Sequence, residues 1–540
     1  IAAPIDSVVD PSIDPRGRTV DYRPAAGNRR ELRGVGAMGE RTAGEKTAKP
    51  ERRELAPGLG ISRIVTGLWQ VADLERGGAA LGEAAVAALA EYAAAGFDSF
   101  DMADHYGSAE LIAGRMARQR PPDRRPTLFT KWCPEPGPMT AEVVRAGVRE
   151  RLDRLGVAKI DLLQLHWWSF ENPGYLDALT ALAELREQGL IGHLGVTNFD
   201  TDHLRVLVGQ GIPIATNQIS FSVLDRRAAG EMSAFCRRYG IGLLAYGTLA
   251  GGFLSDRWVG APEPPEAEIG DWSKMKYKRF VDAIGGWTAL QSVLRALADI
   301  AGRHGVSVAN VATRWVLEQP AVAAIIVGAR LGESEHRADN LRAFDFALDA
   351  ADREVLDAAL AATTPVPGDC GDEYRRPPYL TASGDLSHHL EAIEPVFERV
   401  EVPGRPGRAY VTTGSVWEPI AGYGRATRIG DRILVSGTTA THGAGEVVCP
   451  GDPAGQTVYI LDKIAASIAA LGGTLQDVVR TRVYLCDADQ WEPVSRVHGR
   501  YFGAIRPANT LLEISRLVGP YAVEIEAEAV VSGPADGLAG

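Results

Sequence analysis

The sequence predicts an α/β protein whose larger part is a parallel (β/α)8 TIM barrel, followed by a smaller α+β domain. Two observations predict the barrel: eight short apolar runs occur between residues 63 and 329, and helical segments of a dozen or more residues separate them. A doubly wound open sheet has the same alternation. However, no GxGxxG motif follows the first run, so a Rossmann dinucleotide site has no support.

Each predicted strand is a short apolar run that a helical segment follows. The runs are RIVTGLW (63–69), GFDSFDM (96–102), PTLFTKW (126–132), KIDLLQLHW (159–167), IGHLGVTNF (191–199), IPIATNQIS (212–220), IGLLAYG (241–247) and VAAIIVGA (322–329). Helical candidates between them include GEAAVAALAEYAAAG, MTAEVVRAGVRERLDRLG and GYLDALTALAELREQG.

Composition shifts divide the rest of the chain. Residues 1–58 are rich in Arg, Gly, Pro and acidic residues without an apolar period, which predicts a disordered segment before the barrel of 59–365. An insertion at 255–287 lies at the C-terminal face of the barrel, where a lid is favoured over a disordered loop. Residues 366–404, dense in Pro and Gly, predict a linker.

The domain predicted at 405–535 is built differently. Its β-β-α-β-α-β order begins with paired strands in YGRATRIGDRILVSGTTA, where Gly430-Asp431 supplies the turn. The helices GQTVYILDKIAASIAALGG and DQWEPVSRVHGRYFGAI alternate with further strands, and TLLEISRL and AVEIEAEAVV close the domain. This order predicts a sheet with helices on one face.

Composition excludes several classes of protein. The 540 residues carry a net charge of −12, which argues against nucleic acid as a partner, and no apolar run approaches the ~18 residues of a membrane helix. The N-terminus lacks the basic-then-apolar order of a secretory signal, and the five cysteines show no metal-ligand spacing. We therefore expect a cytoplasmic protein with reduced thiols, no metal and no membrane or nucleic-acid partner.

Four polar residues gather at the predicted C-terminal ends of three consecutive strands, where barrel active sites lie. Asp101 ends the second strand and Tyr106 follows it; Lys131 and His166 end the third and fourth. A phenol is a poor acid at neutral pH unless a neighbouring ammonium stabilises its anion, and a carboxylate can hold that ammonium. An imidazole can orient a carbonyl oxygen or relay a proton. The set suits protonation of a carbonyl oxygen while hydride arrives at the carbon.

At these residues the barrel resembles the aldo-keto reductase family, over about residues 60–362. The segments FDMADHYGSAE, FTKW and LQLHWW carry the resemblance. It implies an NADPH-dependent oxidoreductase that acts on a carbonyl or alcohol group, with Tyr106 as the general acid. By the same likeness Lys131 and His166 would tune and orient Tyr106, and Asp101 would pair with Lys131.

The resemblance also implies residues that hold the nicotinamide. Thr197 and Asn198 stand where the family usually has Ser-Asn, and Thr keeps the hydroxyl of Ser. With Gln218 they would bind the carboxamide, while Tyr246 would stack on the ring.

The rest of the cofactor is expected along a Gly-rich turn and a helix start. Backbone amides around Gly247, Leu249 and Gly251 would approach the pyrophosphate. Arg330 suits an adenosine 2′-phosphate because Arg offers a bidentate fork, and Asn340 matches the family's adenine contact. A solvated charge at the helix start is the alternative interpretation of Arg330. On this evidence NADPH is expected rather than NADH.

Three tryptophans, Trp69, Trp132 and Trp167, lie beside the same strand ends. Ordinary packing at the rim of the barrel is one interpretation. Jointly they indicate an aromatic-lined pocket, and hence a substrate with apolar or ring character.

From about residue 410 to 534 the chain resembles the RidA/YjgF family, whose members hydrolyse reactive enamines and imines. RILVSGTTA, LGGTLQDVVRTRVYLCDADQWEPV, RPANTLLEI and AVEIEAEAV carry the resemblance. It implies a chorismate-mutase-like fold and a homotrimer, with clefts that contain Tyr423, Asn509, Glu524 and Glu526. Asn509 replaces an Arg that grips the substrate carboxylate in active members, which removes a charge-assisted contact of ~1.5–3 kcal/mol. Scaffolding and catalysis therefore both stay open for this domain.

Three hypotheses follow for the whole chain. In the first, the C-terminal domain binds or hydrolyses a reactive imine or enamine that lacks a free carboxylate, and the barrel reduces an aldehyde, ketone or imine. The fusion raises the local concentration of a labile intermediate. The second keeps the reductase and makes the C-terminal domain an inert trimerisation module. The third is a non-enzymatic NADPH sensor, which the complete set of four catalytic residues disfavours.

Overall fold

The computed structural model describes residues 49–76, 78, 81–135, 137–265, 269–270, 272–332, 336–375 and 395–531, all of which belong to one compact unit. Most of the segment expected to be disordered, 1–58, lies outside these residues. Its described end instead carries the strand β1 (Arg52–Ala56), which pairs antiparallel with β2 (Leu59–Ser62). Leu55 and Ile61 of this hairpin pack against Phe129 and Leu162 inside the barrel. The hairpin therefore covers the end where the barrel strands begin.

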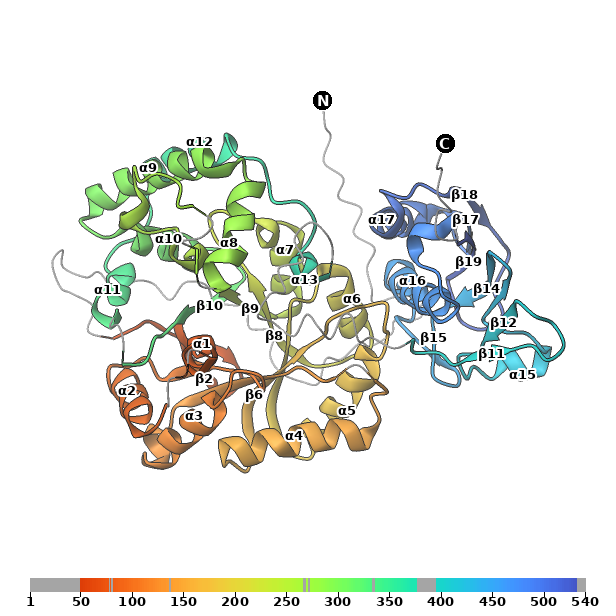
Figure 1. Ribbon diagram of the computed structural model, residues 1–540, viewed down its shortest axis with the longest axis horizontal. Coiled ribbons are helices and arrows are strands. Elements are labelled where there is room, and N and C mark those ends of the chain that lie inside the picture. Colours follow the sequence, from red (N-terminus) through yellow and green to blue (C-terminus); the bar gives the residue numbers. More distant parts are fainter. Residues whose placement is uncertain are drawn as a thin grey trace, which may run out of the picture. The chain divides into compact units, whose positions relative to one another are not determined.

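Eight parallel strands close into a barrel in the order β10-β3-β4-β5-β6-β7-β8-β9 (Figure 1). Each strand lies within an apolar run expected from the sequence, so the predicted barrel is confirmed. The bounds are β3 (Ile64–Gly67), β4 (Ser99–Asp101), β5 (Thr127–Trp132), β6 (Ile160–His166), β7 (Ile191–Thr197), β8 (Ile214–Ser220), β9 (Gly242–Tyr246) and β10 (Val322–Gly328).

Helices pack around this barrel and supply most of its outer core. They are α1 (Trp69–Arg76), α2 (Glu83–Ala94), α3 (Ala109–Arg118), α4 (Ala141–Leu155), α5 (Tyr175–Glu187), α6 (Thr201–Gly209), α7 (Glu231–Tyr239), α8 (Trp272–Ala283), α9 (Gly286–His304), α10 (Val308–Leu317), α11 (Arg337–Leu341) and α12 (Ala350–Ala361). Local chemistry sets their ends: the Thr140 side chain accepts the N–H of Val143 at the start of α4, and Gly156 ends that helix at φ 62°. Among the described residues no helix combines the length and apolar character needed to cross a bilayer.

The segment expected to be a linker, 366–404, is described at both ends. Its first part folds onto the barrel, where α13 (Asp372–Arg375) buries Asp372, Glu373 and Tyr374. Its last part, β11 (Arg399–Glu401), already pairs into the C-terminal sheet. The Pro- and Gly-rich composition thus did not predict the elements α13 and β11. Residues 376–394, between these two elements, lie outside the described residues.

The C-terminal domain is a seven-stranded sheet in the order β11-β12-β13-β14-β19-β17-β18. Two helices, α16 (Pro453–Ala470) and α17 (Trp491–Phe502), cover one face, which confirms the expected α+β layering (Figure 1). Its other elements are β12 (Arg408–Val411), α15 (Trp417–Ala421), β13 (Ala426–Ile429), β14 (Arg432–Thr439), β15 (Thr441–His442), β16 (Glu446–Val447), β17 (Val478–Leu485), β18 (Ala508–Glu513) and β19 (Val523–Val530).

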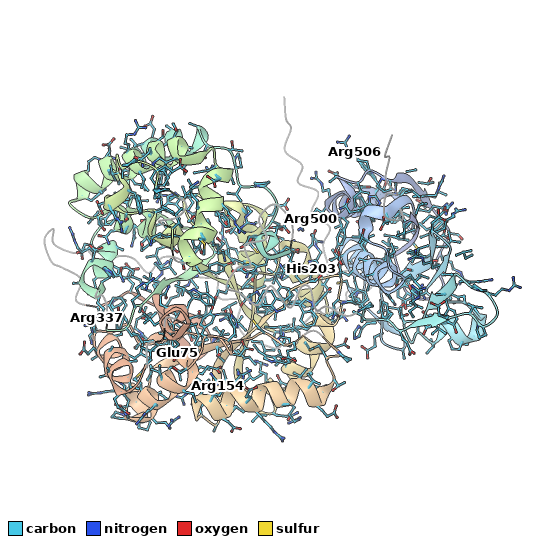
Figure 2. The ribbon with its side chains drawn as sticks, in the orientation of Figure 1. Glu75, Arg154, His203, Arg337, Arg500 and Arg506 are labelled. Atoms are coloured by element: carbon cyan, nitrogen blue, oxygen red, sulfur yellow. The ribbon has the colours of Figure 1, made fainter. Side chains whose placement is uncertain are left out.

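A buried polar network joins this domain to the barrel. His203 of α6 contacts Asp200 through Nδ1 at 2.8 Å and Asp462 of α16 through Nε2 at 3.1 Å. Arg500 of α17 bonds to Asp202 Oδ2 at 2.6 Å and lies 3.4 Å from Asp200. Figure 2 labels the side chains of Arg500 and His203. Burial acts to lower the pKa of His203, but the two carboxylates outweigh it and raise the pKa to about 9. His203 is therefore charged at neutral pH.

Candidate active site

The turn after β4 is fixed to the end of β5 by backbone hydrogen bonds. The N–H of Met102 donates to the carbonyl of Phe129, and that of Asp104 donates to the carbonyl of Lys131. The N–H of Tyr106 donates back to Ala103, which turns the chain. These bonds hold Tyr106 beside the strand ends that carry Asp101, Lys131 and His166.

A buried ion pair lies next to Tyr106. Lys131 Nζ is 2.6 Å from Asp101 Oδ2, and both side chains are almost fully buried. The same ammonium lies 4.9 Å from the centre of the Tyr106 ring. Asp101 Oδ1 accepts a hydrogen bond from Gln218 Nε2 at 2.8 Å, so the carboxylate is held on both oxygens. Gln164 of β6 adds a third contact to Asp101 at 3.3 Å, and sequence reasoning had not identified it.

His166 is buried at the end of β6 under aromatic rings. Its ring centre lies 4.3 Å from Trp168 and 5.5 Å from Tyr374. Burial is the main cause that lowers the pKa of His166 well below its usual value, and electrostatic interactions with His105 and Arg375 add to it. The imidazole is therefore neutral at pH 7, and a neutral ring can donate one N–H.

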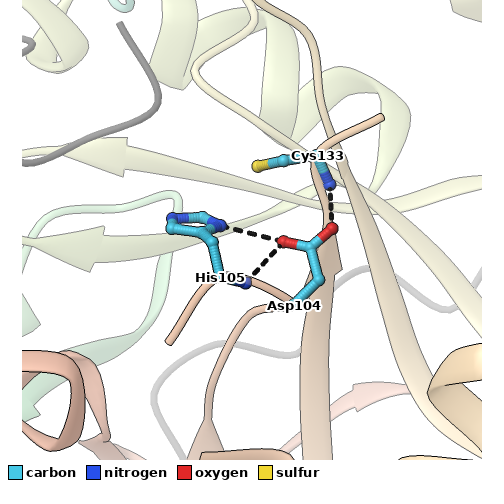
Figure 3. Close-up of side chains that lie close together, drawn as sticks. All are labelled: Asp104, His105 and Cys133. Carbon is cyan, nitrogen blue, oxygen red and sulfur yellow. Dashed lines mark hydrogen bonds and ion pairs between the residues drawn. The ribbon is translucent and has the colours of Figure 1, made fainter. Parts of the chain in front are cut away.

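A second histidine stands beside the tyrosine. His105 Nδ1 lies 2.8 Å from Asp104 Oδ1, and the other oxygen of Asp104 accepts the backbone N–H of Cys133 at 2.7 Å (Figure 3). The His105 ring packs edge-on to Tyr106 at 4.8 Å. Donor atoms of Asp104, His105 and Cys133 lie within 4.8 Å of one another, a spacing that suits a metal ion. Both oxygens of Asp104 already accept hydrogen bonds, however, so we assign Asp104 the role of orienting His105.

One cavity of about 370 Å³ unites most of the expected site. It contains all four proposed catalytic residues together with Trp69 and His105. The other residues in its wall are Gly67, Gln70, Thr197, Asn198, Gln218, Tyr246, Gly247, Thr248, Leu249, Gly251, Gly252, Ser273, Lys274, Lys276, Tyr277, Ile326, Val327, Gly328, Arg330 and Tyr374.

The polar groups expected to hold a nicotinamide lie together in this wall. Thr197 Oγ1 is buried and has no hydrogen-bond partner among the described residues. Asn198 adopts the left-handed region at φ 58°, held by its N–H to Gln218 O at 2.8 Å. Tyr246 donates its hydroxyl to Asn198 Oδ1 at 2.8 Å. An unpartnered buried hydroxyl beside a carboxamide suits the amide of a nicotinamide, so the residues present fit that cofactor.

Cationic side chains also belong to the cavity wall. Arg330 lies in this wall, as do Gly247, Leu249 and Gly251 of the Gly-rich turn. Lys274 and other residues of α8 also line the cavity, so the insertion 255–287 contributes wall residues. Asn340 lies on α11 and is not part of the cavity wall.

Two of the three expected tryptophans lie outside the cavity, which corrects the predicted aromatic lining. Trp132 packs outward against α4, where an added Cβ on Gly147 would approach its ring to 2.5 Å. Trp167 donates its Nε1–H to Ser169 O at 2.7 Å and faces the outer layer. Trp69 does line the cavity.

An aromatic wall instead comes from α13, in the segment that was expected to be a linker. Tyr374 lines the cavity, and Lys276 Nζ of α8 lies 4.2 Å above its ring and bonds to its hydroxyl. No local pattern in GDCGDEYRR predicts this placement, because it depends on contacts with distant parts of the chain. Tyr374, Lys276 and His105 are therefore wall residues that sequence reasoning missed.

In the C-terminal domain the expected cleft residues form two groups. The Tyr423 hydroxyl accepts a hydrogen bond from Arg425 at 2.9 Å, and Arg425 also donates to the carbonyl of Gly437. The Glu524 carboxylate lies next to the Cα of Gly437. Burial, and then the charge of Glu526, raise the pKa of Glu524. Tyr423, Arg425 and Glu524 are thus close together, and Arg425 had not been expected.

Asn509 belongs to the other group. Its side chain donates to Thr481 Oγ1 at 3.0 Å, and that oxygen also bonds to His498 of α17. Asn509 therefore faces the helix-covered side of the sheet. Glu526 alternates with the buried residues of β19 and pairs with Arg482 on the opposite face. Within one chain the structure does not bring Asn509 and Glu526 together.

A closed parallel barrel with a buried acid–base group at its C-terminal mouth, beside a cavity that suits a nicotinamide, defines a barrel oxidoreductase. Residues 63–361, more than half of the chain, match the model of the Aldo/keto reductase family, and the chain belongs to this family. Members use nicotinamide cofactors. Residues 413–531 match the family model described as Endoribonuclease L-PSP, which confirms the RidA/YjgF resemblance.

Individual relatives agree with the family. A protein called aldo-keto reductase from Mycobacterium sp. (strain KMS) is 37% identical over 206 residues, which are 37% of this chain and 68% of the relative. Flagellar radial spoke protein 5 of Chlamydomonas reinhardtii is 34% identical over 29% of this chain, and the match spans only 33% of that protein. NADH-specific methylglyoxal reductase of Escherichia coli (strain K12) is 25% identical over 55% of this chain and 94% of its own length.

Proposed function

We propose that the barrel reduces an aldehyde, ketone or imine with NADPH and that Tyr106 supplies the proton. The observation that carries this proposal is the convergence of Tyr106, His166 and the Lys131–Asp101 pair on one cavity that also contains the Thr197–Asn198 group. A bound nicotinamide supplies hydride to the carbon of the substrate double bond. The product is then an alcohol, or an amine from an imine.

Each residue of the group has a defined task in this reaction. The Tyr106 hydroxyl gives its proton to the substrate oxygen or nitrogen, which leaves a phenolate. The Lys131 ammonium, 4.9 Å from the ring centre, stabilises that phenolate, and Asp101 keeps the ammonium in place. Neutral His166 donates an N–H that orients the substrate oxygen. The aromatic wall of Trp69 and Tyr374 favours a substrate with apolar or ring character.

NADPH, rather than NADH, is proposed because cationic side chains belong to the cavity wall. Arg330 and Lys274 line the cavity, and an Arg fork binds phosphate in a bidentate manner. The name of the Escherichia coli relative shows that NADH specificity occurs among similar proteins, so Arg330 is the residue to test.

Replacement of this arginine separates the two cofactors. With benzaldehyde as substrate, Arg330→Ala should raise the KM for NADPH by about 10- to 150-fold, the value of a lost charge-assisted contact, and leave the KM for NADH unchanged. The reaction is followed by cofactor absorbance with both cofactors. An equal change for both, or a wild-type preference for NADH, would contradict the proposal.

For the C-terminal domain we propose imine or enamine binding and trimer formation. Tyr423, Arg425 and Glu524 support a small polar cleft, in which Glu524 would activate the water that converts a C=N group to a carbonyl with release of ammonia. The uncovered sheet face, where Leu434, Leu512 and Val530 are exposed, supports burial against other copies of the chain.

Two measurements test this second part. Glu524→Gln should abolish ammonia release from a small imine without a carboxylate and leave carbonyl reduction intact. Unchanged ammonia release in this variant would exclude Glu524 as the activating group, and no ammonia release by the wild type would favour the inert trimerisation module. Sedimentation equilibrium should give three times the 57.7 kDa of one chain, and a monomer would refute the trimer.

A further inference from the structure

The segment that leaves the barrel, Asp369–Arg375, is seated tightly against the proposed nicotinamide site. Gly371 has φ +89°, and an added Cβ there would lie 2.2 Å from the backbone oxygen of Asn198. Arg375 donates to that same oxygen and to the carbonyl of Trp167, both at 2.6 Å. The segment therefore has no room to shift toward the barrel without displacing Asn198.

The same segment touches the acid–base group. Glu373 Oε1 lies 3.1 Å from the Tyr246 hydroxyl, and the Glu373 carboxylate pairs with Arg227 at 2.9 Å. Tyr374 packs edge-on to His166 at 5.5 Å and faces the cavity. Lys276 of the insertion 255–287 bonds to the Tyr374 hydroxyl, so two segments remote in sequence meet in the cavity wall. The part of the cavity beside His166 is where the proposed reaction places the substrate oxygen.

The first residue of the segment faces the C-terminal domain. Asp369 Oδ2 lies 3.5 Å from Arg500, whose guanidinium also contacts Asp200 and Asp202. One cation of the C-terminal domain thus stands among three carboxylates of the barrel side. Burial, and then the charge of Asp200, raise the pKa of Asp369 to about 6, so at neutral pH its carboxylate depends on Arg500 for compensation.

We propose that Tyr374 is a specificity-determining wall of the carbonyl pocket and that Arg500 is the positioning residue through which the C-terminal domain holds this wall. Loss of Arg500 leaves the carboxylates of Asp369, Asp200 and Asp202 to repel one another, which moves the start of the segment. The C-terminal domain then affects which carbonyl compounds the barrel accepts. The inference rests on the proposed reductase function and adds a determinant of its specificity.

The wall is tested with two aldehydes of different shape, benzaldehyde and propanal. Tyr374→Ala should raise the KM for benzaldehyde by about 10-fold or more relative to that for propanal, because pocket contacts of this kind discriminate by 10- to 200-fold. Tyr374→Phe, which keeps the ring, should retain the ratio of the wild type. An unchanged ratio in Tyr374→Ala would overturn the assignment of the wall.

The holding role is tested in the full chain by Arg500→Gln. The benzaldehyde-to-propanal ratio of KM values should move in the same direction as in Tyr374→Ala, and amide hydrogen exchange in peptides covering 366–375 should quicken. Arg500→Lys, which keeps the cation, should restore both readouts. Arg496→Gln is the matched control, because Arg496 lies on the same helix and pairs only with Glu492 in the described structure.

The outcomes separate this inference from the proposed function. If Arg500→Gln keeps the amide hydrogen exchange and the benzaldehyde-to-propanal ratio of KM values of the wild type, the holding role is overturned, while the proposed reductase function is unaffected. If the wild type reduced neither aldehyde, the proposed function would fail, and the exchange measurement would still decide whether Arg500 holds the segment. Should Arg500→Gln not fold, Asp369→Ala removes the other end of the ion pair, with the same expectations.

Discussion

At the scale of single residues, the Lys131–Asp101 pair is the most costly feature of the site. Both charges are almost fully buried, and burial of two ions costs several kcal/mol each before their attraction offsets it. Such a pair adds little to stability compared with apolar residues of similar volume. Its value here is chemical, since it keeps an ammonium beside the Tyr106 ring.

Removal of one charge should therefore destabilise the barrel. Asp101→Asn leaves the buried Lys131 ammonium without a counter-charge and is expected to lower the free energy of unfolding by about 3–5 kcal/mol. Urea denaturation followed by circular dichroism measures this. Glu83→Gln is the control, because it breaks an exposed pair with Arg115 and should cost at most about 1 kcal/mol. Similar losses in the two variants would show that the Lys131 charge is solvated.

Single residues also show which side-chain placements the sequence predicts and which it does not. Asp101, Lys131 and His166 were placed correctly because parallel barrel strands all end at one face. Trp132 and Trp167 were misplaced, since adjacent positions on a strand point to opposite sides and composition does not tell which side faces the cavity. No local sequence pattern predicted that Tyr374 lies in the cavity wall.

At the scale of elements, apolar runs predicted the eight barrel strands because strands that are buried on both faces are continuously apolar. The β1–β2 hairpin was not predicted because RRELAPGLGIS carries few apolar residues. The hairpin is stabilised by the packing of Leu55 and Ile61 against barrel residues. α13 was likewise concealed by a Gly- and Pro-rich context. Both elements are stabilised by tertiary contacts, which local secondary-structure propensity does not predict.

The fit of the α13 segment can be tested at one glycine. Gly371→Ala adds a methyl group 2.2 Å from the Asn198 backbone oxygen and is expected to destabilise the chain by about 1–3 kcal/mol more than the control. It should also weaken NADPH binding, measured by fluorescence titration, because Asn198 must move. Gly404→Ala is the control: its φ is similarly positive at +73°, but nothing lies within 4 Å of the added atom. Equal effects in the two variants would show that the segment is loosely seated.

At the scale of the whole molecule, the junction between the barrel and the C-terminal domain depends on charge as well as apolar contact. His203 lies between Asp200 and Asp462, and Tyr175 and Tyr501 also bond to Asp462. Because His203 is charged when folded and its pKa is raised to about 9, its contribution is fully present below the usual pKa near 6.5. That contribution is lost as the pH rises through about 9.

The junction should consequently weaken in alkali. Between pH 7.5 and pH 9.5 the wild type should lose about 2 kcal/mol of stability from this group, seen as a lower melting temperature in calorimetry. His203→Gln should be less stable at pH 7.5 and should show a smaller fall over the same range. His304→Gln, which removes a histidine–carboxylate pair with Asp352 between α9 and α12, serves as the control. A fall in His203→Gln as large as that of the wild type would exclude His203 as the cause.

The central claim concerns the proton that Tyr106 donates, and the Tyr106→Phe variant tests it most directly. With benzaldehyde and saturating NADPH, this variant should lose about 100- to 10,000-fold in kcat, the usual contribution of a general acid, while the dissociation constant for NADPH stays at the wild-type value. A kcat equal to that of the wild type, or turnover in neither protein despite bound NADPH, would contradict the assignment of this cavity as a carbonyl-reducing site.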